Sequence, residues 1–106
     1  MSLQKTINLY IISDSVGGTA NQLGQAAMTQ FPDADIKVSA YPFIRGTDTL
    51  ISILEKADID NALVLHTFVD EELNKMAQLF CKEHELVCFD PLSPIIREIE
   101  TRSELA

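Results

Sequence analysis

The chain has 106 residues, which is enough for one folded domain and too few for two. An apolar fraction of 46% excludes a disordered chain, and no apolar run is long enough to cross a bilayer. The net charge of −8 argues against nucleic acids and anionic membranes as partners, although backbone amides can still bind an anion locally.

Four apolar, β-rich runs alternate with four segments in which apolar residues recur every three or four positions. The first run is apolar at nearly every position, which is typical of a central strand covered on both faces. The second run alternates polar and apolar residues, which indicates an edge strand. Asp70 and Ser93, the latter followed by Pro94, are the predicted caps of the last two helices. The predicted order is strand 7–13, helix 17–31, strand 36–43, helix 47–57, strand 62–68, helix 70–85, strand 86–89 and a helix that starts at Ser93.

This alternation predicts an α/β fold. Helical crossovers between consecutive strands imply parallel pairing, and right-handed crossovers place helices on both faces of the sheet. We expect a three-layer Rossmann-like or flavodoxin-like domain with a four-stranded parallel sheet in the order 2-1-3-4. Four strands are few for this class, so we interpret residues 1–106 as a single domain of a longer protein.

The two cysteines, Cys81 and Cys88, bear on the compartment and on metal binding. No secretory signal precedes the first apolar run, so we expect a cytoplasmic protein in which both cysteines are reduced and buried. They are not spaced as a metal-binding pair, and His66 and His84 are the only histidines, so we predict no metal site.

The turn between the first strand and the first helix carries the strongest functional signal. It reads Ser-Asp-Ser-Val-Gly-Gly-Thr over residues 13–19. In open parallel sheets, ligands bind beyond the carboxyl ends of the strands, where the strand order switches. Glycines let the backbone approach a ligand closely, and a helix start offers free N–H groups that suit phosphate. The predicted phosphate-binding residues are Ser13, Asp14, Ser15, Gly17, Gly18 and Thr19, joined by Arg45 from the end of the second strand.

Each of these residues also has a purely structural interpretation. Ser15 can cap the first helix while the glycines only form the turn. Asp14 can be a solvated or capping residue instead of a base or a magnesium ligand, and Arg45 can be a surface residue. The turn matches neither the P-loop nor the GxGxxG pattern. Both interpretations stay open at this point.

The third strand ends at the same edge and supplies three secondary candidates, His66, Thr67 and Asp70. His66 is a candidate general acid or base, but strand alternation favours a hydrogen-bonded core residue. Asp70 is better explained as a helix cap. We do not expect Cys88 to act as a nucleophile, because no base lies near it in the sequence. No catalytic residue is assigned.

Residues 10–20 resemble the SDSxGxTA signature that opens the pyruvate phosphate dikinase regulatory proteins. The resemblance covers nearly the whole chain, and the opening signature is its most specific part. A departure occurs at Gly18, where the family often has an acidic residue. The other residues that carry the resemblance are Pro42, Phe43, Arg45, Thr67, Val69, Asp70 and residues 90–94.

The resemblance implies a bifunctional serine/threonine kinase and phosphorylase. Such proteins use ADP to phosphorylate a threonine of the dikinase, or of phosphoenolpyruvate synthase, and use inorganic phosphate to remove it with release of pyrophosphate. Family members are far longer, and their nucleotide-binding P-loop lies in a second half that is absent here. We therefore expect this fragment to carry no cofactor and no catalysis alone. Its loop would face the missing half or the phosphothreonine segment of the target.

Three other interpretations remain. A flavodoxin-like mononucleotide binder would need Tyr41 or Phe68 to cover a flavin, since the chain has no tryptophan. A receiver-type phosphoacceptor is disfavoured, because Thr67 stands where that class needs an aspartate. A protein-interaction domain would use the acidic third helix for docking. The edge of the sheet also allows a homodimer.

Overall fold

The computed structural model describes residues 5–104 and contains each predicted strand and helix. The main differences lie at the element ends. The first helix stops at Met28 instead of residue 31, and the fourth strand shrinks to two residues. The elements are β1 (Ile7–Ser13), α1 (Gly18–Met28), β2 (Ile36–Tyr41), α2 (Thr47–Ile59), β3 (Leu63–Thr67), α3 (Glu71–Glu83), β4 (Cys88–Phe89) and α4 (Leu92–Glu104).

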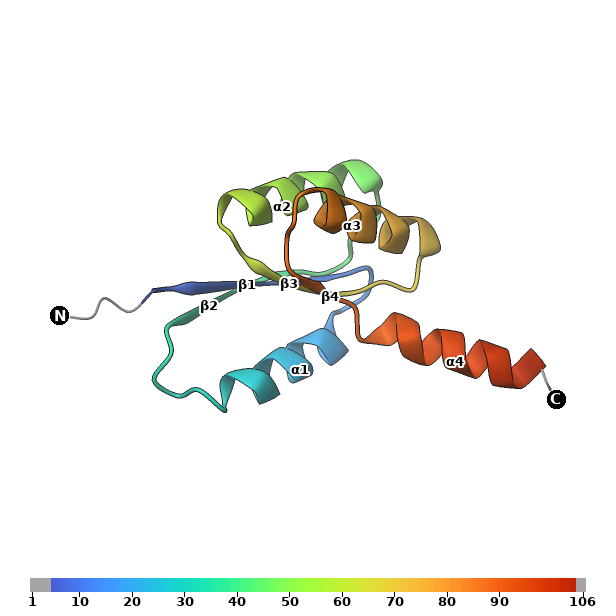
Figure 1. Ribbon diagram of the computed structural model, residues 1–106, viewed down its shortest axis with the longest axis horizontal. Helices are drawn as coiled ribbons and strands as arrows, with labels where there is room; N and C mark the ends of the chain where they lie inside the picture. Colours follow the sequence, from blue (N-terminus) through green and yellow to red (C-terminus); the bar gives the residue numbers. More distant parts are fainter. Residues whose placement is uncertain (1–4, 105–106) are drawn as a thin grey trace.

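The sheet has four parallel strands in the order β2-β1-β3-β4, which confirms the predicted topology. β1 is an inner strand, in register with β2 through Ile7 and Ile36 and with β3 through Leu9 and Leu63. β2 is an edge strand, as its alternating pattern predicted. The carboxyl ends of β1 and β3 therefore lie side by side, and the loops that follow them meet at one edge of the sheet (Figure 1).

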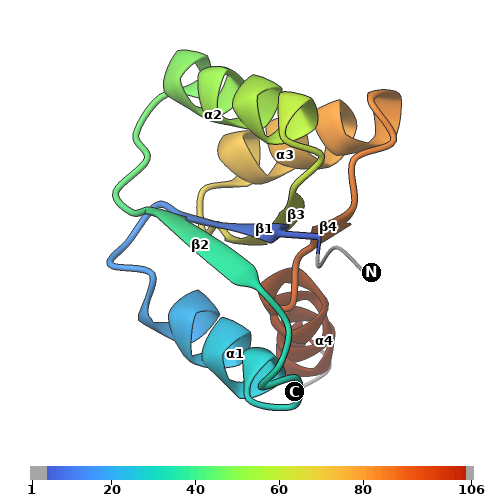
Figure 2. The same cartoon turned by 90° about the vertical axis from the view of Figure 1, so that its left-hand side faces the viewer.

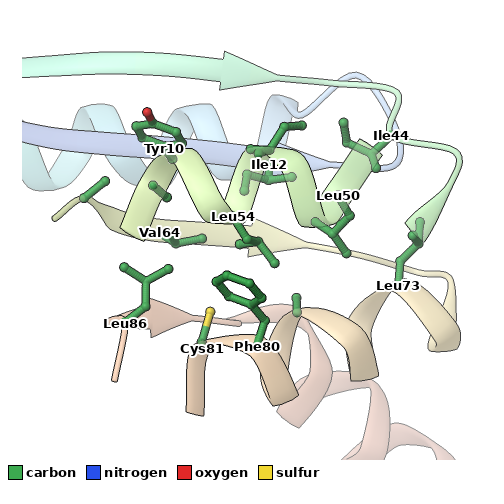
Figure 3. Packing of buried hydrophobic residues seen from close by; sticks show 14 of the residues in the cluster. Tyr10, Ile12, Ile44, Leu50, Leu54, Val64, Leu73, Phe80, Cys81 and Leu86 are labelled. Atoms are coloured by element: carbon green, nitrogen blue, oxygen red, sulfur yellow. The ribbon is translucent and has the colours of Figure 1, made fainter. Parts of the chain in front are cut away.

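The sheet has helices on both faces, with α2 and α3 on one side and α1 and α4 on the other (Figure 2). The main hydrophobic core lies between the sheet and the α2/α3 pair (Figure 3). Strand alternation explains this, because every second residue of β1 and β3 points to that side. Fully buried members of this core include Tyr10, Ile12, Leu50, Leu54, Val64 and Phe68.

The opposite face is covered less completely. Its buried cluster consists of Leu9, Ile11 and Ala20. Gly24 lets α1 approach the sheet, since a Cβ at this position would lie 3.3 Å from Cδ1 of Ile11. Beside α1 runs an apolar groove of about 500 Å³. Its lining residues include Ile7, Leu23, Phe31, Leu63, Leu65 and Phe89.

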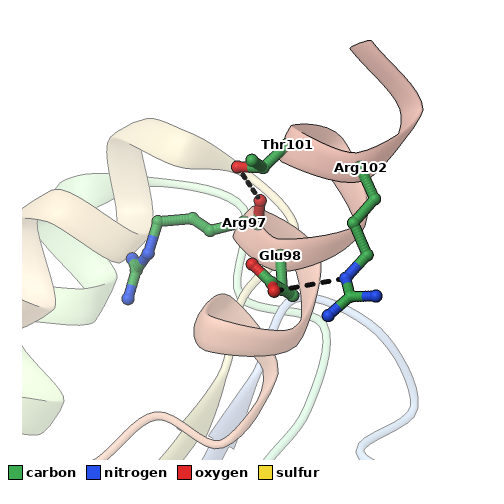
Figure 4. Close-up of polar contacts among 4 residues, drawn as sticks. All are labelled: Arg97, Glu98, Thr101 and Arg102. Atoms are coloured by element: carbon green, nitrogen blue, oxygen red, sulfur yellow. Dashed lines mark hydrogen bonds and ion pairs between the residues drawn. The ribbon is translucent and has the colours of Figure 1, made fainter. Parts of the chain in front are cut away.

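Helix α4 starts near the end of β4 and extends past the ends of the strands (Figure 1). Ser93, the predicted cap, lies inside this helix, and the prediction is wrong. The carboxylate of Asp90 accepts the Ser93 N–H instead, at 3.1 Å. Asp and Ser are almost equally favoured as caps, so the pattern did not distinguish them. Farther along α4, an exposed ion pair joins Arg102 to Glu98 (Figure 4).

Cys81 and Cys88 form a disulfide, so the prediction that both are reduced is wrong. The turn after α3 brings β4 back beside the last turns of that helix, with the two Cα atoms 6.4 Å apart. This distance lies within the range that a disulfide spans. None of the helices within residues 5–104 has the length and apolar character that a membrane span requires.

Candidate phosphate-binding site

The turn after β1 lies at the carboxyl edge of the sheet, beside the end of β3. Ser15, Gly18 and Thr19 are exposed there, whereas Gly17 is buried. The strand before the turn is thus internal and the turn is open to solvent, as a ligand-binding turn of a parallel sheet requires.

The backbone of this turn depends on Gly17, which has a φ of 81° immediately before α1. A side chain is strained in that left-handed region, so glycine suits the position. Among the described residues, no side chain caps α1, in contrast to the alternative in which Ser15 would do so. The first N–H groups of a helix have no intrahelical acceptor, so this helix start can donate to an anion.

Ser13 holds the turn together from inside the protein. Its buried hydroxyl donates to the carbonyl oxygen of Thr67 at 3.2 Å and accepts the Ser15 N–H at 3.1 Å. The carbonyl groups of the turn are also used, because Ser15 accepts the Phe43 N–H and Ser13 accepts the Ile44 N–H. These bonds fix the turn against β3 and against the segment after β2.

Asp14 joins the turn to the start of α3. Its carboxylate accepts the Val69 N–H at 3.1 Å and the Asp70 N–H at 2.9 Å. This role differs from both structural interpretations of the sequence, because the side chain is half-buried and does not cap α1. Asp14 therefore sets the position of the loop after β3.

Arg45 reaches the same edge, as predicted. Its guanidinium donates to the main-chain carbonyl of Asp14 and lies 5.7 Å from the ring centroid of Phe43. The side chain remains exposed, so a positive charge stands next to the turn. The guanidinium is held by one main-chain acceptor and retains further N–H donors.

The secondary candidates separate into different environments. Thr67 borders the turn, and Asp70 caps α3 by accepting the Leu73 N–H at 3.0 Å, as predicted. His66 is buried on the α2/α3 face, as predicted, and stacks on Phe68 at 5.5 Å between ring centroids, but its buried Nδ1 has no hydrogen-bond partner within the described residues, so the predicted hydrogen bonding is wrong for that atom. Burial lowers the pKa of His66, although the negative charge of Asp90 acts to raise it.

A cavity of about 270 Å³ opens where these loops meet. We call it the loop cavity. Its volume suits a phosphate-sized group. Three of the predicted phosphate-binding residues, Ser13, Asp14 and Arg45, lie outside its lining, and three lining residues, Val16, Val69 and Leu92, were not predicted. Leu92 and Val69 belong to segments that carry the family resemblance, but the apolar pattern did not place either beside the turn. The lining residues are Ser15, Val16, Gly17, Gly18, Thr19, Thr67, Val69 and Leu92.

A second cleft of about 520 Å³ continues from the loop cavity between α3 and α4, with Val69 on the border of both. It is more polar, and it has basic residues, Lys75 and Arg97, as well as the acidic residues Glu71 and Glu100. The carboxyl edge of the sheet therefore offers a small pocket beside a longer polar cleft. Within the described residues, no group of three or more potential metal-ligating side chains occurs.

Comparison with known proteins matches residues 9–106 to the family described as Kinase/pyrophosphorylase. A pyruvate, phosphate dikinase regulatory protein of Pediococcus pentosaceus is 42% identical over 97% of this chain and 38% of its own length. Relatives with the same type of name occur in Latilactobacillus sakei, at 35% identity over 100% of this chain and 38% of the relative, and in Clostridioides difficile, at 37% over 95% and 36%. The chain thus spans a little over one third of the length of these curated relatives.

Proposed function

This chain belongs to the kinase/pyrophosphorylase family, and we propose that it is the N-terminal domain of a bifunctional enzyme that regulates pyruvate phosphate dikinase or phosphoenolpyruvate synthase. The enzyme would use ADP to phosphorylate a threonine of the cytoplasmic target. In the reverse regulatory step, inorganic phosphate would take the phosphoryl group from phosphothreonine, which yields pyrophosphate and restores the threonine hydroxyl. The names of the relatives support the regulatory role.

The contribution of this domain would be to bind a phosphate group, while the nucleotide-binding P-loop would belong to the remaining part of the enzyme. The observation that carries this proposal is the glycine turn at the carboxyl end of an inner strand, followed by a helix start without a side-chain cap. Free N–H groups and the positive end of the helix dipole favour an anion there. Local binding of this kind is compatible with a net charge of −8.

The polar cleft between α3 and α4 suits the approach of a protein target. It adjoins the loop cavity through Val69, and it offers a partner both basic and acidic side chains, namely Lys75, Arg97, Glu71 and Glu100. A phosphothreonine held in the loop cavity would leave its flanking residues in this cleft. The turn would equally be able to present a phosphate to the missing catalytic half.

A titration followed by amide NMR tests the proposed phosphate site. Phosphate or pyrophosphate should shift the amide signals of residues 13–19 and of Arg45, and ADP should act through its phosphates on the same signals. Gly17→Ala should weaken this response, because alanine is strained at a φ of 81°. Gly46→Ala is the matched control, since a Cβ there meets nothing within 4 Å.

Amide shifts on addition of phosphate that persist in Gly46→Ala and weaken in Gly17→Ala would support the proposed phosphate site. Unchanged signals over residues 13–19 with all three ligands would contradict it and favour an interaction domain. Amide shifts that ADP causes but phosphate and pyrophosphate do not, at residues outside 13–19, would instead favour the mononucleotide-binding alternative.

Catalysis provides a separate test. The 106-residue chain, incubated with ADP and the dikinase, should transfer no phosphoryl group, since the P-loop half is required. Incorporation of labelled phosphate into the dikinase by this chain alone would contradict the proposed division between the two halves. A full-length relative, such as the Pediococcus pentosaceus protein, serves as the positive control.

A further inference from the structure

The disulfide between Cys81 and Cys88 is located where it can connect chemistry at the protein surface with the loop cavity. Cys81 is a buried residue in the last turns of α3, and Cys88 is a half-buried residue of β4. Both cysteines border a cavity of about 260 Å³ on the α3 side of the sheet, which we call the disulfide cavity. The other residues that line it are His66, Gln78, Lys82, Leu86 and Asp90.

We propose that Cys81 and Cys88 form a reversible redox-modification site that reacts with low-molecular-weight thiols and controls the wall of the loop cavity. The redox reaction stands by itself, whereas its effect on ligand binding rests on the proposed function. Three observations support the proposal: a cavity lined by both cysteines, the short pairing of β4, and the short path from Cys88 to Leu92.

Access is provided by the disulfide cavity. Cys88 is more exposed than Cys81, so an incoming thiolate has its nearest target at the Sγ atom of Cys88. Lys82 lines the same cavity, and its positive charge favours an anionic sulfur, although Asp90 also lines the cavity and opposes this. The site therefore offers a thiol reagent a cavity that borders a half-buried cysteine and a basic residue.

The reaction is a two-electron exchange. The first thiolate attacks Sγ of Cys88, the bond between the cysteines breaks, and its electron pair moves to Sγ of Cys81, which takes a proton from water. A second thiolate attacks the reagent sulfur of the mixed disulfide and displaces the Cys88 thiolate. Two thiols are thereby oxidised to one disulfide while the protein gains two cysteine thiols. Oxidised reagent reverses both steps.

β4 is a short strand, and besides the disulfide its flanking residues are joined to α3 by a main-chain bond from the Leu86 N–H to the Cys81 carbonyl and by a side-chain bond from Gln78 to Asp90. It is two residues long, and within residues 5–104 it pairs with β3 alone, through Val64 with Cys88 and Leu65 with Phe89. One further main-chain bond runs from the Val64 N–H to the Val87 carbonyl at 2.9 Å. The disulfide ties this short strand to α3, so its reduction should loosen β4.

From β4 the path to the loop cavity is short. Asp90 accepts hydrogen bonds from the Ser93 N–H and from Gln78, so it links the start of α4 to α3. Leu92 follows and forms part of the wall of the loop cavity, four residues after Cys88. A change in the position of β4 therefore reaches the loop cavity through Asp90 and Leu92.

Reduction and reoxidation of the 106-residue chain test the proposal. The folded chain is first treated with oxidised glutathione and is then unfolded for alkylation. It should then react with no iodoacetamide. After treatment with dithiothreitol in the folded state, it should take up two equivalents, and oxidised glutathione should restore the first result. Amide signals of Leu92, Gly17 and Gly18 should shift on reduction without any phosphate present. Phosphate affinity should fall on the order of fivefold, a typical size for coupling between sites.

A Cys81→Ser/Cys88→Ser variant is the matched control. It should show the amide signals of the reduced protein and should not respond to dithiothreitol. Cysteines that stay alkylatable after oxidised glutathione would overturn the proposal, as would a bond that survives excess dithiothreitol in the folded chain. Shifts that stop before Leu92 would also overturn it. If phosphate binds neither redox form, the proposed function fails, while the alkylation and amide results still decide the redox proposal.

Discussion

The two faces of the sheet differ in how completely they are covered, although the same strands form both. On the α2/α3 face, alternate residues of β1 and β3 are sealed by two helices, and Tyr10, Ile12 and Val64 are at most 2% exposed. On the opposite face, α1 packs against Leu9 and Ile11 while α4 extends past the ends of the strands (Figure 1), and the apolar groove beside α1 remains open. The apolar character of β1 therefore does not translate into equal packing on its two sides.

This difference indicates where the stability of the domain originates. Burial of apolar surface is the main favourable term in folding, and the α2/α3 face supplies most of it. The α1 face keeps large apolar side chains in contact with water, among them Leu23 and Phe31. We therefore expect substitutions on the α2/α3 face to affect the free energy of unfolding strongly, and those on the α1 face to affect it weakly.

The largest difference in stability between the two faces should appear when one leucine on each face is truncated to alanine. Leu54 of α2 is fully buried, so Leu54→Ala should lower the free energy of unfolding by about 3 kcal/mol through lost burial and a cavity. Leu23 of α1 is 44% exposed, so Leu23→Ala should cost less than about 1 kcal/mol. Urea unfolding followed by circular dichroism measures both values. Equal losses in the two variants would show that the faces contribute alike.

A second comparison adds volume instead of removing it. Ala57 of α2 is fully buried, so Ala57→Val should destabilise the fold by about 1–3 kcal/mol through overpacking. Gly24→Ala on α1 should stabilise it by up to about 1 kcal/mol, because alanine is the better helix former. The new methyl group would lie 3.3 Å from Cδ1 of Ile11 and 3.4 Å from Cδ2 of Leu9, both of them ends of flexible side chains that would have to give only slightly, and Leu9 borders the open groove. A loss of stability in Gly24→Ala would mean that the α1 face is as tightly packed as the other.

Much of the fold could be predicted from the sequence because local patterns determine it. Apolar periodicity located every strand and helix, and the contrast between the first two strands predicted the inner and edge positions that the sheet shows. The rule that ligand-binding loops follow parallel strands correctly placed the glycine turn beside Arg45 and Thr67. That these residues bind phosphate stays a prediction.

The features that the sequence did not predict depend on contacts between distant segments or on small differences in energy. The disulfide joins a helix to a strand across a turn, and a separation of seven residues does not reveal how close the two sulfur atoms lie. The bonds of Asp14 to Val69 and Asp70 cross between two loops 55 residues apart. The choice of Asp90 over Ser93 as the capping residue involves two side chains of nearly equal preference.

A smaller effect should come from the helix caps. Asp70 caps α3 on the well-packed face, so Asp70→Ala should lower the free energy of unfolding by about 1 kcal/mol. Asp48 lies in the first turn of α2, where no side-chain cap bond occurs within the described residues. Asp48→Ala should therefore cost only about 0.3–0.5 kcal/mol through the helix dipole. Thermal unfolding at neutral pH measures both, and a larger loss in Asp48→Ala would contradict the assignment of Asp70 as the cap.

The smallest effect should appear in the pH dependence of stability, through His66 beneath α3. Burial lowers the pKa of His66 below its ordinary value of 6.5, and the charge of Asp90 only partly offsets this. Below pH 6.5 the unfolded chain therefore binds more protons at this residue than the folded chain does. Since the state that binds more protons gains on acidification, His66 makes the free energy of unfolding fall as the pH drops below 6.5.

His66→Gln removes this titration while keeping a polar side chain at the same place. The difference in stability between wild type and variant should be greatest near pH 7 and should narrow towards pH 5. The pKa of Asp90 contributes at lower pH, because burial acts to raise it but hydrogen bonds from Ser93 and Gln78 bring it below 3.8. Urea unfolding at pH 7, 6 and 5 separates the two residues. Parallel curves for wild type and variant would mean that His66 is not held neutral by burial, and the α2/α3 face would then be more open to water than its packing indicates.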